Sequence, residues 1–275
     1  MKKIKIGILT DIQYCDSDPD TEHNRYFRNS LQKVDQIIQI FNVEDLDFIV
    51  NLGDTIDKNF ESFDTITKKL SHFNAPLFNL IGNHDYDVAP EKKKFVPAQL
   101  GLKDNYYYFD IEGFRYCFLD GNEISGFSTE KDSSHHKEAI ELLAKMRLEN
   151  KANANEWNGG MSSDQINWFR LRLQEALRMN LKVIVFCHYP IFPEGKHSLL
   201  NNIEILDIID EHSHIAAWFC GHNHDGNYDK INNCHILNFK AIVDTEDENA
   251  FSIIEVTDES LKLKAWGREI VRALV

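Results

Sequence analysis

Five short apolar runs in this chain each end in a polar cluster, and this pattern limits the possible folds more than any other feature. The runs are residues 4–9, 48–50, 76–81, 182–187 and 215–220. Each run has the length and composition of a buried strand. Segments with helical spacing of apolar residues, 26–41 and 60–73, separate the first three runs. The order strand, helix, strand, helix, strand favours an α/β fold with a layered sheet.

The remaining sequence fits one domain spanning residues 1–275, without a linker rich in Pro, Gly or Ser. Residues 106–119 and 250–266 have the pattern of two hairpins. Helices are expected at 135–148, 162–178 and 203–212, and Ser162 with Gln165 forms a capping-box signature for the second of these. The polar stretch near 121–160 is expected to be an inserted loop and helix region.

The polar clusters after the five strands contain side chains that bind metal ions. They are Asp11-Ile12-Gln13, Gly53-Asp54, Gly82-Asn83-His84-Asp85, His188-Tyr189-Pro190 and Gly221-His222-Asn223-His224. Because ligand sites in open α/β sheets form at the carboxyl ends of strands, these clusters are expected to converge on one pocket.

The residue types in these clusters indicate which metals the pocket would hold. Carboxylates, imidazoles and amide oxygens suit manganese, iron, zinc or magnesium, and the absence of cysteine disfavours a structural zinc site. Two divalent cations about 3.5–4 Å apart can deprotonate a water molecule between them and hold phosphoryl oxygens. Such a pair needs a bridging carboxylate, for which Asp54 is the candidate.

Together, and in this order, the five clusters resemble the signature of the calcineurin-like metallophosphoesterase superfamily. The resemblance implies a β-sandwich flanked by helices, with αββα layers. It also implies that Asp54 bridges two cations and that His84 acts on the phosphate without binding metal, with Asp85 placed to orient His84. The implied ligands of the first cation are Asp11, Gln13 and His224, and those of the second are Asn83, His188 and His222.

Gln13 departs from the usual superfamily pattern, which has His at this position. A neutral amide oxygen is a harder ligand than imidazole and favours manganese or magnesium over zinc. Gln13, together with other short motifs, makes the chain similar to the manganese-dependent ADP-ribose/CDP-alcohol diphosphatases. These motifs are residues 11–14, 25–30, 158–160 followed by Gln165 and Trp168, 221–226, 250–251 and 266–268.

This narrower resemblance implies hydrolysis of the phosphoanhydride of ADP-ribose, CDP-alcohols or similar small nucleotides. The attacking group would be a hydroxide that bridges the two metal ions. Three alternatives remain open: a cyclic-nucleotide or other phosphodiesterase on the same site, a non-catalytic binding module with this fold, and a DNA nuclease. The nuclease is disfavoured because the formal net charge is -14 and no basic face is evident.

Three further residues are candidate substrate contacts. Arg25 and Arg28 lie at the start of the first expected helix, and guanidinium groups suit a pyrophosphate. They could equally be surface arginines that pair with acids. Tyr14 could stack on a base, although packing in the core or at the rim explains it as well.

Cysteine content and hydropathy indicate where the protein works. The five cysteines are odd in number and form no C-x-x-C pair, so no disulfide framework is expected. Lys5 and Asp11 interrupt any signal-type apolar segment at the start, and no stretch has the length of a membrane span. We expect a cytoplasmic enzyme that acts on small nucleotides and binds neither nucleic acid nor membranes.

Overall fold

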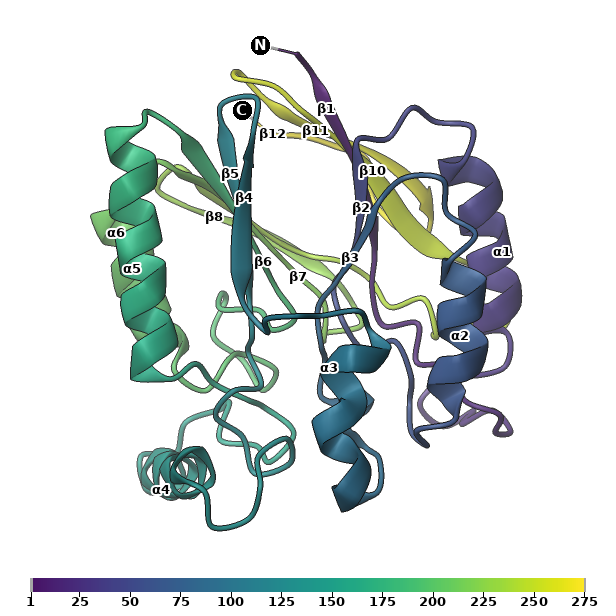
Figure 1. The fold of residues 1–275 in the computed structure, drawn as a ribbon, viewed down its shortest axis with the longest axis horizontal. Helices are drawn as coiled ribbons and strands as arrows, with labels where there is room; N and C mark the ends of the chain where they lie inside the picture. The colour runs from purple at the N-terminus through teal and green to yellow at the C-terminus, as the bar shows by residue number, and fades with distance from the viewer. Residues whose placement is uncertain (1, 275) are drawn as a thin grey trace.

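Two six-stranded sheets face one another in the computed structural model, which describes residues 2–274 (Figure 1). In the first sheet the strand order is β12-β11-β10-β1-β2-β3, and in the second it is β4-β5-β6-β7-β9-β8. The first comprises β1 (Ile4–Leu9), β2 (Phe48–Asn51), β3 (Leu77–Asn79), β10 (Ala250–Val256), β11 (Leu261–Gly267) and β12 (Arg272–Leu274). The second comprises β4 (Tyr107–Ile111), β5 (Phe114–Leu119), β6 (Lys182–Cys187), β7 (Ile215–Cys220), β8 (Asn227–Ile231) and β9 (Cys234–Asn238).

Helices cover the outer face of each sheet. The first is covered by α1 (Ser30–Phe41) and α2 (Ser62–Leu70), and the second by α5 (Ser163–Arg178) and α6 (Asn202–Glu211) (Figure 1). The shorter α3 (Val96–Gln99), η1 (His84–Tyr86) and η2 (Pro90–Phe95), and the longer α4 (Ser134–Leu148), lie near the end of the sandwich where β1 and β6 finish. The predicted αββα sandwich is therefore confirmed.

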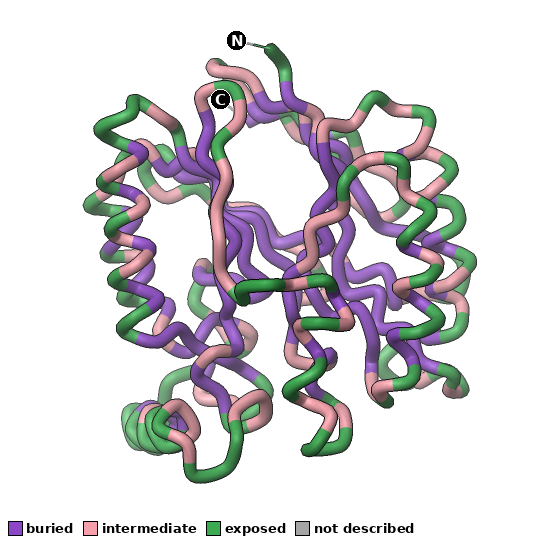
Figure 2. Tube along the Cα trace, in the orientation of Figure 1, coloured by how far each residue is buried: buried purple, intermediate pink, exposed green. Residues whose placement is uncertain are grey.

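Alternation of side chains along the strands divides the apolar core into layers. In β6, Ile184 and Phe186 point into the cluster between the sheets, whereas Val183 and Val185 pack beneath α5 and α6. The central strands β1, β2, β6 and β7 are accordingly buried on both faces, whereas the strands at the sheet edges and the outer sides of the helices are partly exposed (Figure 2). Burial on both faces explains why these strands read as continuous apolar runs in the sequence.

Strand direction brings the expected polar clusters to one edge. β1, β2 and β3 are parallel neighbours in the first sheet, and β6 and β7 are parallel neighbours in the second. Parallel neighbours end at the same edge, so their carboxyl ends meet there. No helix between residues 2 and 274 is both long and apolar enough to cross a bilayer.

Several element boundaries differ from the sequence expectation. α1 begins at Ser30 and not near residue 26, because residues 20–26 form bridges with Asp244 and within their own loop. The hydroxyl of Ser162 caps α5 by accepting from the Gln165 amide, as predicted. The carboxylate that accepts from the Ser162 amide, however, is Glu123. The hairpin β8–β9 was not expected, because β8 carries a polar sequence.

Candidate metal centre

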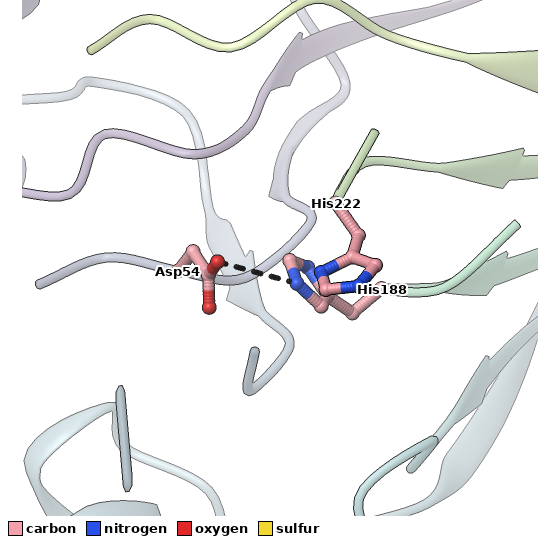
Figure 3. A group of neighbouring side chains, drawn as sticks. All are labelled: Asp54, His188 and His222. Carbon is pink, nitrogen blue, oxygen red and sulfur yellow. Dashed lines mark ion pairs between the residues drawn. The ribbon is translucent and has the colours of Figure 1, made fainter. Parts of the chain in front are cut away.

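The ends of β2, β6 and β7 bring a carboxylate and two imidazoles together. Potential ligand atoms of Asp54, His188 and His222 all lie within 4.8 Å of one another, and all three residues are buried. The Nε2 of His188 lies 3.4 Å from the Oδ2 of Asp54, as the dashed line in Figure 3 shows. Two strands of one sheet and one strand of the other thus contribute to a single centre.

A second group of expected ligands touches the same carboxylate. Gln13 Nε2 lies 3.1 Å from Asp54 Oδ2 and 3.2 Å from His224 Nε2. His224 Nε2 lies 3.6 Å from Asp11 Oδ1. We call Asp11, Gln13 and His224 the first ligand set, and Asn83, His188 and His222 the second ligand set. Asp54 Oδ2 therefore contacts a member of each set.

Several of these side chains carry buried polar atoms without a hydrogen-bond partner in the described part of the chain. These atoms are Asp11 Oδ1, Gln13 Oε1, Asn83 Oδ1 and His188 Nε2. A buried polar atom without a partner is destabilising by about 1–3 kcal/mol, and four in one cluster are unusual. All four are oxygen or nitrogen atoms that coordinate divalent cations. The donor set therefore fits a metal site.

The other ring nitrogen of each candidate histidine is held by a partner outside the cluster. His188 Nδ1 lies 2.9 Å from the Leu52 carbonyl oxygen, His222 Nε2 lies 3.0 Å from Asn158 Oδ1, and His224 Nδ1 lies 2.8 Å from Asp244 Oδ1. Such a contact fixes which ring nitrogen carries the proton and leaves the other free for a metal. The free nitrogens are Nε2 of His188 and His224 and Nδ1 of His222.

Four residues of the cluster have backbone conformations in the left-handed region. The φ angles of Asp11, Gln13, Asp54 and His222 are 49°, 43°, 54° and 65°. Non-glycine residues seldom adopt this left-handed region, and such strain persists mainly where function requires it. The turns after β1, β2 and β7 therefore place their side chains at some cost to stability.

Two glycines allow the turns to approach one another closely. A Cβ built on Gly82 would lie 2.1 Å from Asp54 Oδ1, and one built on Gly221 would lie 2.5 Å from Asp11 Oδ2. Any larger residue would push a carboxylate out of the cluster. This contact explains why glycine precedes Asn83 and His222 in the two motifs.

The pKa values of the buried ligands are shifted in different directions by burial and by neighbouring charges. Burial raises the pKa of Asp11 and lowers that of His222. Burial also opposes ionisation of Asp54, but the neighbouring His188 and His84 outweigh it and hold the pKa of Asp54 below its ordinary value. The buried centre thus contains an ionised carboxylate and a neutral imidazole, which are the forms that bind cations.

His84 is oriented by Asp57, not by Asp85 as expected. His84 Nδ1 lies 3.2 Å from the Oδ1 of Asp57. The Asp85 carboxylate instead accepts from the backbone amides of Thr55, Ile56 and Gly82, at 2.9, 3.1 and 2.9 Å. The buried Asp85 carboxylate therefore links the turn after β3 to the turn after β2.

The three candidate substrate contacts differ in their surroundings. Arg25 is half-buried, has no ion pair in the described part of the chain, and lies near enough to His84 to affect the pKa of that imidazole. Arg28 is exposed and its guanidinium already pairs with Asp16 and Asp18, at 2.5 and 2.6 Å. Tyr14 is 8% exposed and packs in the apolar cluster beneath α1 and α2. The structure thus places only Arg25 near the centre with its charge free.

Sequence reasoning missed residues that support the centre from outside. Asp57, three positions after Asp54, and Asn158, in the inserted region, both lie outside the five polar clusters that follow the strands. Asp244 carried no signal, because nothing near it in the sequence links it to His224. Only spatial proximity identifies these partners.

Comparison with known proteins agrees with this geometry. The profile of the calcineurin-like phosphoesterase family matches residues 4–226. Two relatives, from Arabidopsis thaliana and Bos taurus, are each named manganese-dependent ADP-ribose/CDP-alcohol diphosphatase. They are 27% and 25% identical over 95% of this chain, and the matches cover 94% and 91% of their own lengths.

A solved structure shares the whole fold. It is a dimetal phosphatase from Danio rerio, which superposes with a TM-score of 0.89 over 98% of both chains at 20% sequence identity. At this identity the likeness concerns the arrangement of the two sheets and their helices.

Proposed function

Because the chain belongs to the calcineurin-like phosphoesterase family, we propose that it is a metal-dependent hydrolase that cleaves the phosphoanhydride of small nucleotides such as ADP-ribose and CDP-alcohols. The observation that carries the proposal is the contact of Asp54 Oδ2 with both ligand sets, each of which has buried atoms without partners. The names of the relatives from Bos taurus and Arabidopsis thaliana support the substrate class and the choice of manganese.

In this proposal the first ligand set would hold one cation, the second ligand set would hold another, and Asp54 would serve both. When bound, two divalent cations supply Lewis acidity that activates water and neutralises phosphoryl charge. The outer contacts of His188, His222 and His224 orient the three rings so that the coordinating nitrogens are directed inward.

His84 would stabilise the negative charge that develops on the phosphoryl and leaving oxygens. Its Nδ1 contacts Asp57, so Nε2 is the nitrogen available to a substrate. Burial lowers the pKa of His84, but Asp54 and Asp57 outweigh burial and raise it to about 9. A protonated imidazole is thus available at neutral pH to donate a charge-assisted hydrogen bond to the phosphate oxygens.

Arg25 would recognise the second phosphate of a diphosphate. Its charge is not engaged by any carboxylate in the described part of the chain, and it lies near both His84 and His197. A guanidinium group can bind two phosphate oxygens at once. This interaction favours a diphosphate over a substrate with one phosphorus.

The test is a substrate panel with metal-stripped protein that is supplied again with manganese. ADP-ribose and CDP-choline are compared with cyclic AMP and bis-p-nitrophenyl phosphate. We expect manganese-dependent release of AMP and CMP from the first two. Turnover confined to cyclic AMP or the aryl diester would favour a phosphodiesterase, and no turnover of any substrate would contradict catalysis.

Asp54→Asn provides the matched control for this panel. It removes a charge from the carboxylate that both ligand sets share and keeps its size, so turnover should fall to background. Glu259→Gln, at an exposed position in the turn after β10 and at the opposite end of the sheet, makes a comparable chemical change away from the centre and should leave turnover intact. Full activity in Asp54→Asn would contradict the proposed mechanism.

We also propose that residues 1–275 form one domain in which the inserted region near 121–160 helps to shape the centre. The support is Asn158, which lies in this region and contacts His222. The protein is further proposed to act in the cytoplasm, because all five cysteines are buried and unpaired, as in reducing compartments. The acidic net charge of -14 supports small nucleotides, not nucleic acids, as partners.

A further inference from the structure

A buried lysine on α1 has no carboxylate partner in the described part of the chain. Lys33 is 1% exposed, and its ammonium group donates to the carbonyl oxygens of Ile242, Asp244 and Thr245, at 2.8, 2.7 and 2.7 Å. Burying an ammonium is unfavourable unless its hydrogen bonds are satisfied. An ammonium has three donors, and here each one finds a backbone acceptor. Lys33 therefore fastens the segment 242–245 to α1.

The segment that Lys33 holds also contacts the first ligand set. Asp244 Oδ1 lies 2.8 Å from His224 Nδ1. The amide of Val243 donates to the Asp11 carbonyl oxygen at 3.0 Å, and the amide of Ala241 donates to that of His224 at 3.3 Å. Displacement of this segment would therefore move the carboxylate that fixes the His224 ring.

Ser30 makes a corresponding contact one turn earlier on the same helix. Its hydroxyl donates to the carbonyl oxygen of Ile12 at 2.6 Å, and Ile12 lies between Asp11 and Gln13. Residues three apart lie on the same face of a helix, so Ser30 and Lys33 both project from the buried face of α1. One contacts the turn after β1, and the other contacts the segment behind His224.

We propose that Lys33 and Ser30 are positioning residues for the first ligand set, acting through backbone carbonyl groups and through Asp244. The inference rests on the proposed two-cation centre. Neither residue contacts the second ligand set, whose outer contacts come from Leu52 and Asn158. Loss of either residue should therefore lower the affinity for the cation of the first ligand set and leave the affinity for the other cation unchanged.

The experiment is calorimetric titration of manganese into the metal-stripped full chain. Wild type should show two binding steps, and His224→Ala identifies which step belongs to the first ligand set. Lys33→Met keeps the length of the side chain but removes its donors. We expect the first-set step to weaken by roughly 10–100-fold, as for other outer contacts of metal ligands, and the other step to be unchanged. In Lys33→Met, manganese concentrations that occupy only the unaffected site should give no electron paramagnetic resonance signature of a coupled manganese pair.

Arg115→Met is the control for general loss of stability. Arg115 is also buried and fully hydrogen-bonded, but it lies near the start of β5, away from the ligand sets. This variant should be destabilised and retain both binding steps. If Lys33→Met retained both steps, or weakened them equally, the proposed positioning role would be overturned.

A double variant tests whether Lys33 acts through Asp244. If it does, Lys33→Met combined with Asp244→Asn should bind the first cation about as weakly as Asp244→Asn alone, because coupled residues are not additive. Additive losses would contradict this route. If Lys33→Met does not fold, Ser30→Ala provides a second test, because it removes only one hydroxyl. Ser30→Ala should lower manganese affinity at the first-set step alone. Wild-type affinity at that step in Ser30→Ala would then overturn the proposal.

These outcomes are independent of substrate turnover. Selective loss of the first-set binding step in Lys33→Met supports the positioning role even if none of the four substrates is hydrolysed. A wild-type protein that binds no manganese contradicts both the positioning role and the proposed function.

Discussion

His222 Nε2 lies 3.0 Å from Asn158 Oδ1, a residue 64 positions earlier in the chain. Because an amide oxygen can only accept, the imidazole donates from Nε2 and leaves Nδ1 free toward Asp54 and His188. The loop before α5 therefore decides the tautomer of a residue at the end of β7.

Removing this contact should lower the affinity of the second ligand set for its cation. In Asn158→Ala the His222 ring can rotate or change tautomer, and manganese affinity at one binding step should fall by roughly 10–100-fold. Calorimetry measures the change. Asn155→Ala, which removes a half-buried amide from the same loop, should bind manganese as wild type does. Equal effects of the two variants would mean that the loop as a whole, and not the contact with His222, determines manganese affinity.

His84→Ala should slow turnover of both ADP-ribose and the aryl diester. Loss of the imidazole removes a donor to the oxygens on which charge develops, so kcat on either substrate should fall by about 10²–10³-fold. The losses should be similar, because a phosphate monoester, whose second pKa is about 6, and p-nitrophenolate both leave without a proton. Asp57→Asn should show smaller losses on both substrates, because it acts through His84. An unchanged kcat in His84→Ala would exclude this role.

Gly82→Ala should weaken the binding of both cations. The added methyl group would collide with the Asp54 carboxylate, which contacts both ligand sets. Manganese stoichiometry, measured by elemental analysis after dialysis, should fall below that of wild type. Gly126→Ala, whose nearest neighbour to the new Cβ is 3.7 Å away, should keep the wild-type stoichiometry.

Gln13→His should shift metal preference toward zinc. Imidazole is a softer ligand than the amide oxygen that it replaces, and Gln13 Oε1 has no partner to lose in the described chain. The ratio of zinc to manganese dissociation constants, obtained by competition, should decrease relative to wild type. An unchanged ratio would show that Gln13 does not coordinate.

Stability should depend on pH through Asp120. Burial raises the pKa of this carboxyl from 3.8 to about 6, so the folded state binds the proton more tightly than the unfolded state. Its contribution to stability is present below pH 3.8 and is lost as pH rises to about 6. One pKa unit corresponds to about 1.4 kcal/mol, so the loss approaches roughly 3 kcal/mol.

Asp120→Asn removes this titration while keeping an acceptor for the Asn122 amide. The free energy of unfolding of the variant relative to wild type should therefore rise between pH 4 and pH 6 and stay level above that. Urea denaturation of both proteins across this range measures the difference. A difference independent of pH would show that Asp120 titrates normally.

Local sequence pattern was sufficient to predict an α/β order of strands and helices and the polar residues at the ends of strands, whereas the αββα sandwich followed from the family resemblance. Continuous apolar runs specify buried strands, and a polar residue that directly follows such a run must lie at the edge of the sheet. Asp11, Asp54 and His188 could be placed this way because only local pattern was needed. The N-cap at Ser162 is equally local.

The side chains that support these residues could be identified only from contacts in the folded protein. Asp57 and Asp85 are both short acids near the turns, and the choice between them as the partner of His84 depends on the direction of each side chain in the folded turns. Lys33 looks like a solvent-facing position in a helix until three carbonyl groups from residues 242–245 surround it. Such contacts join segments as far as 212 residues apart. Sequence periodicity describes the face of an element, whereas the partner on that face is fixed by packing between elements.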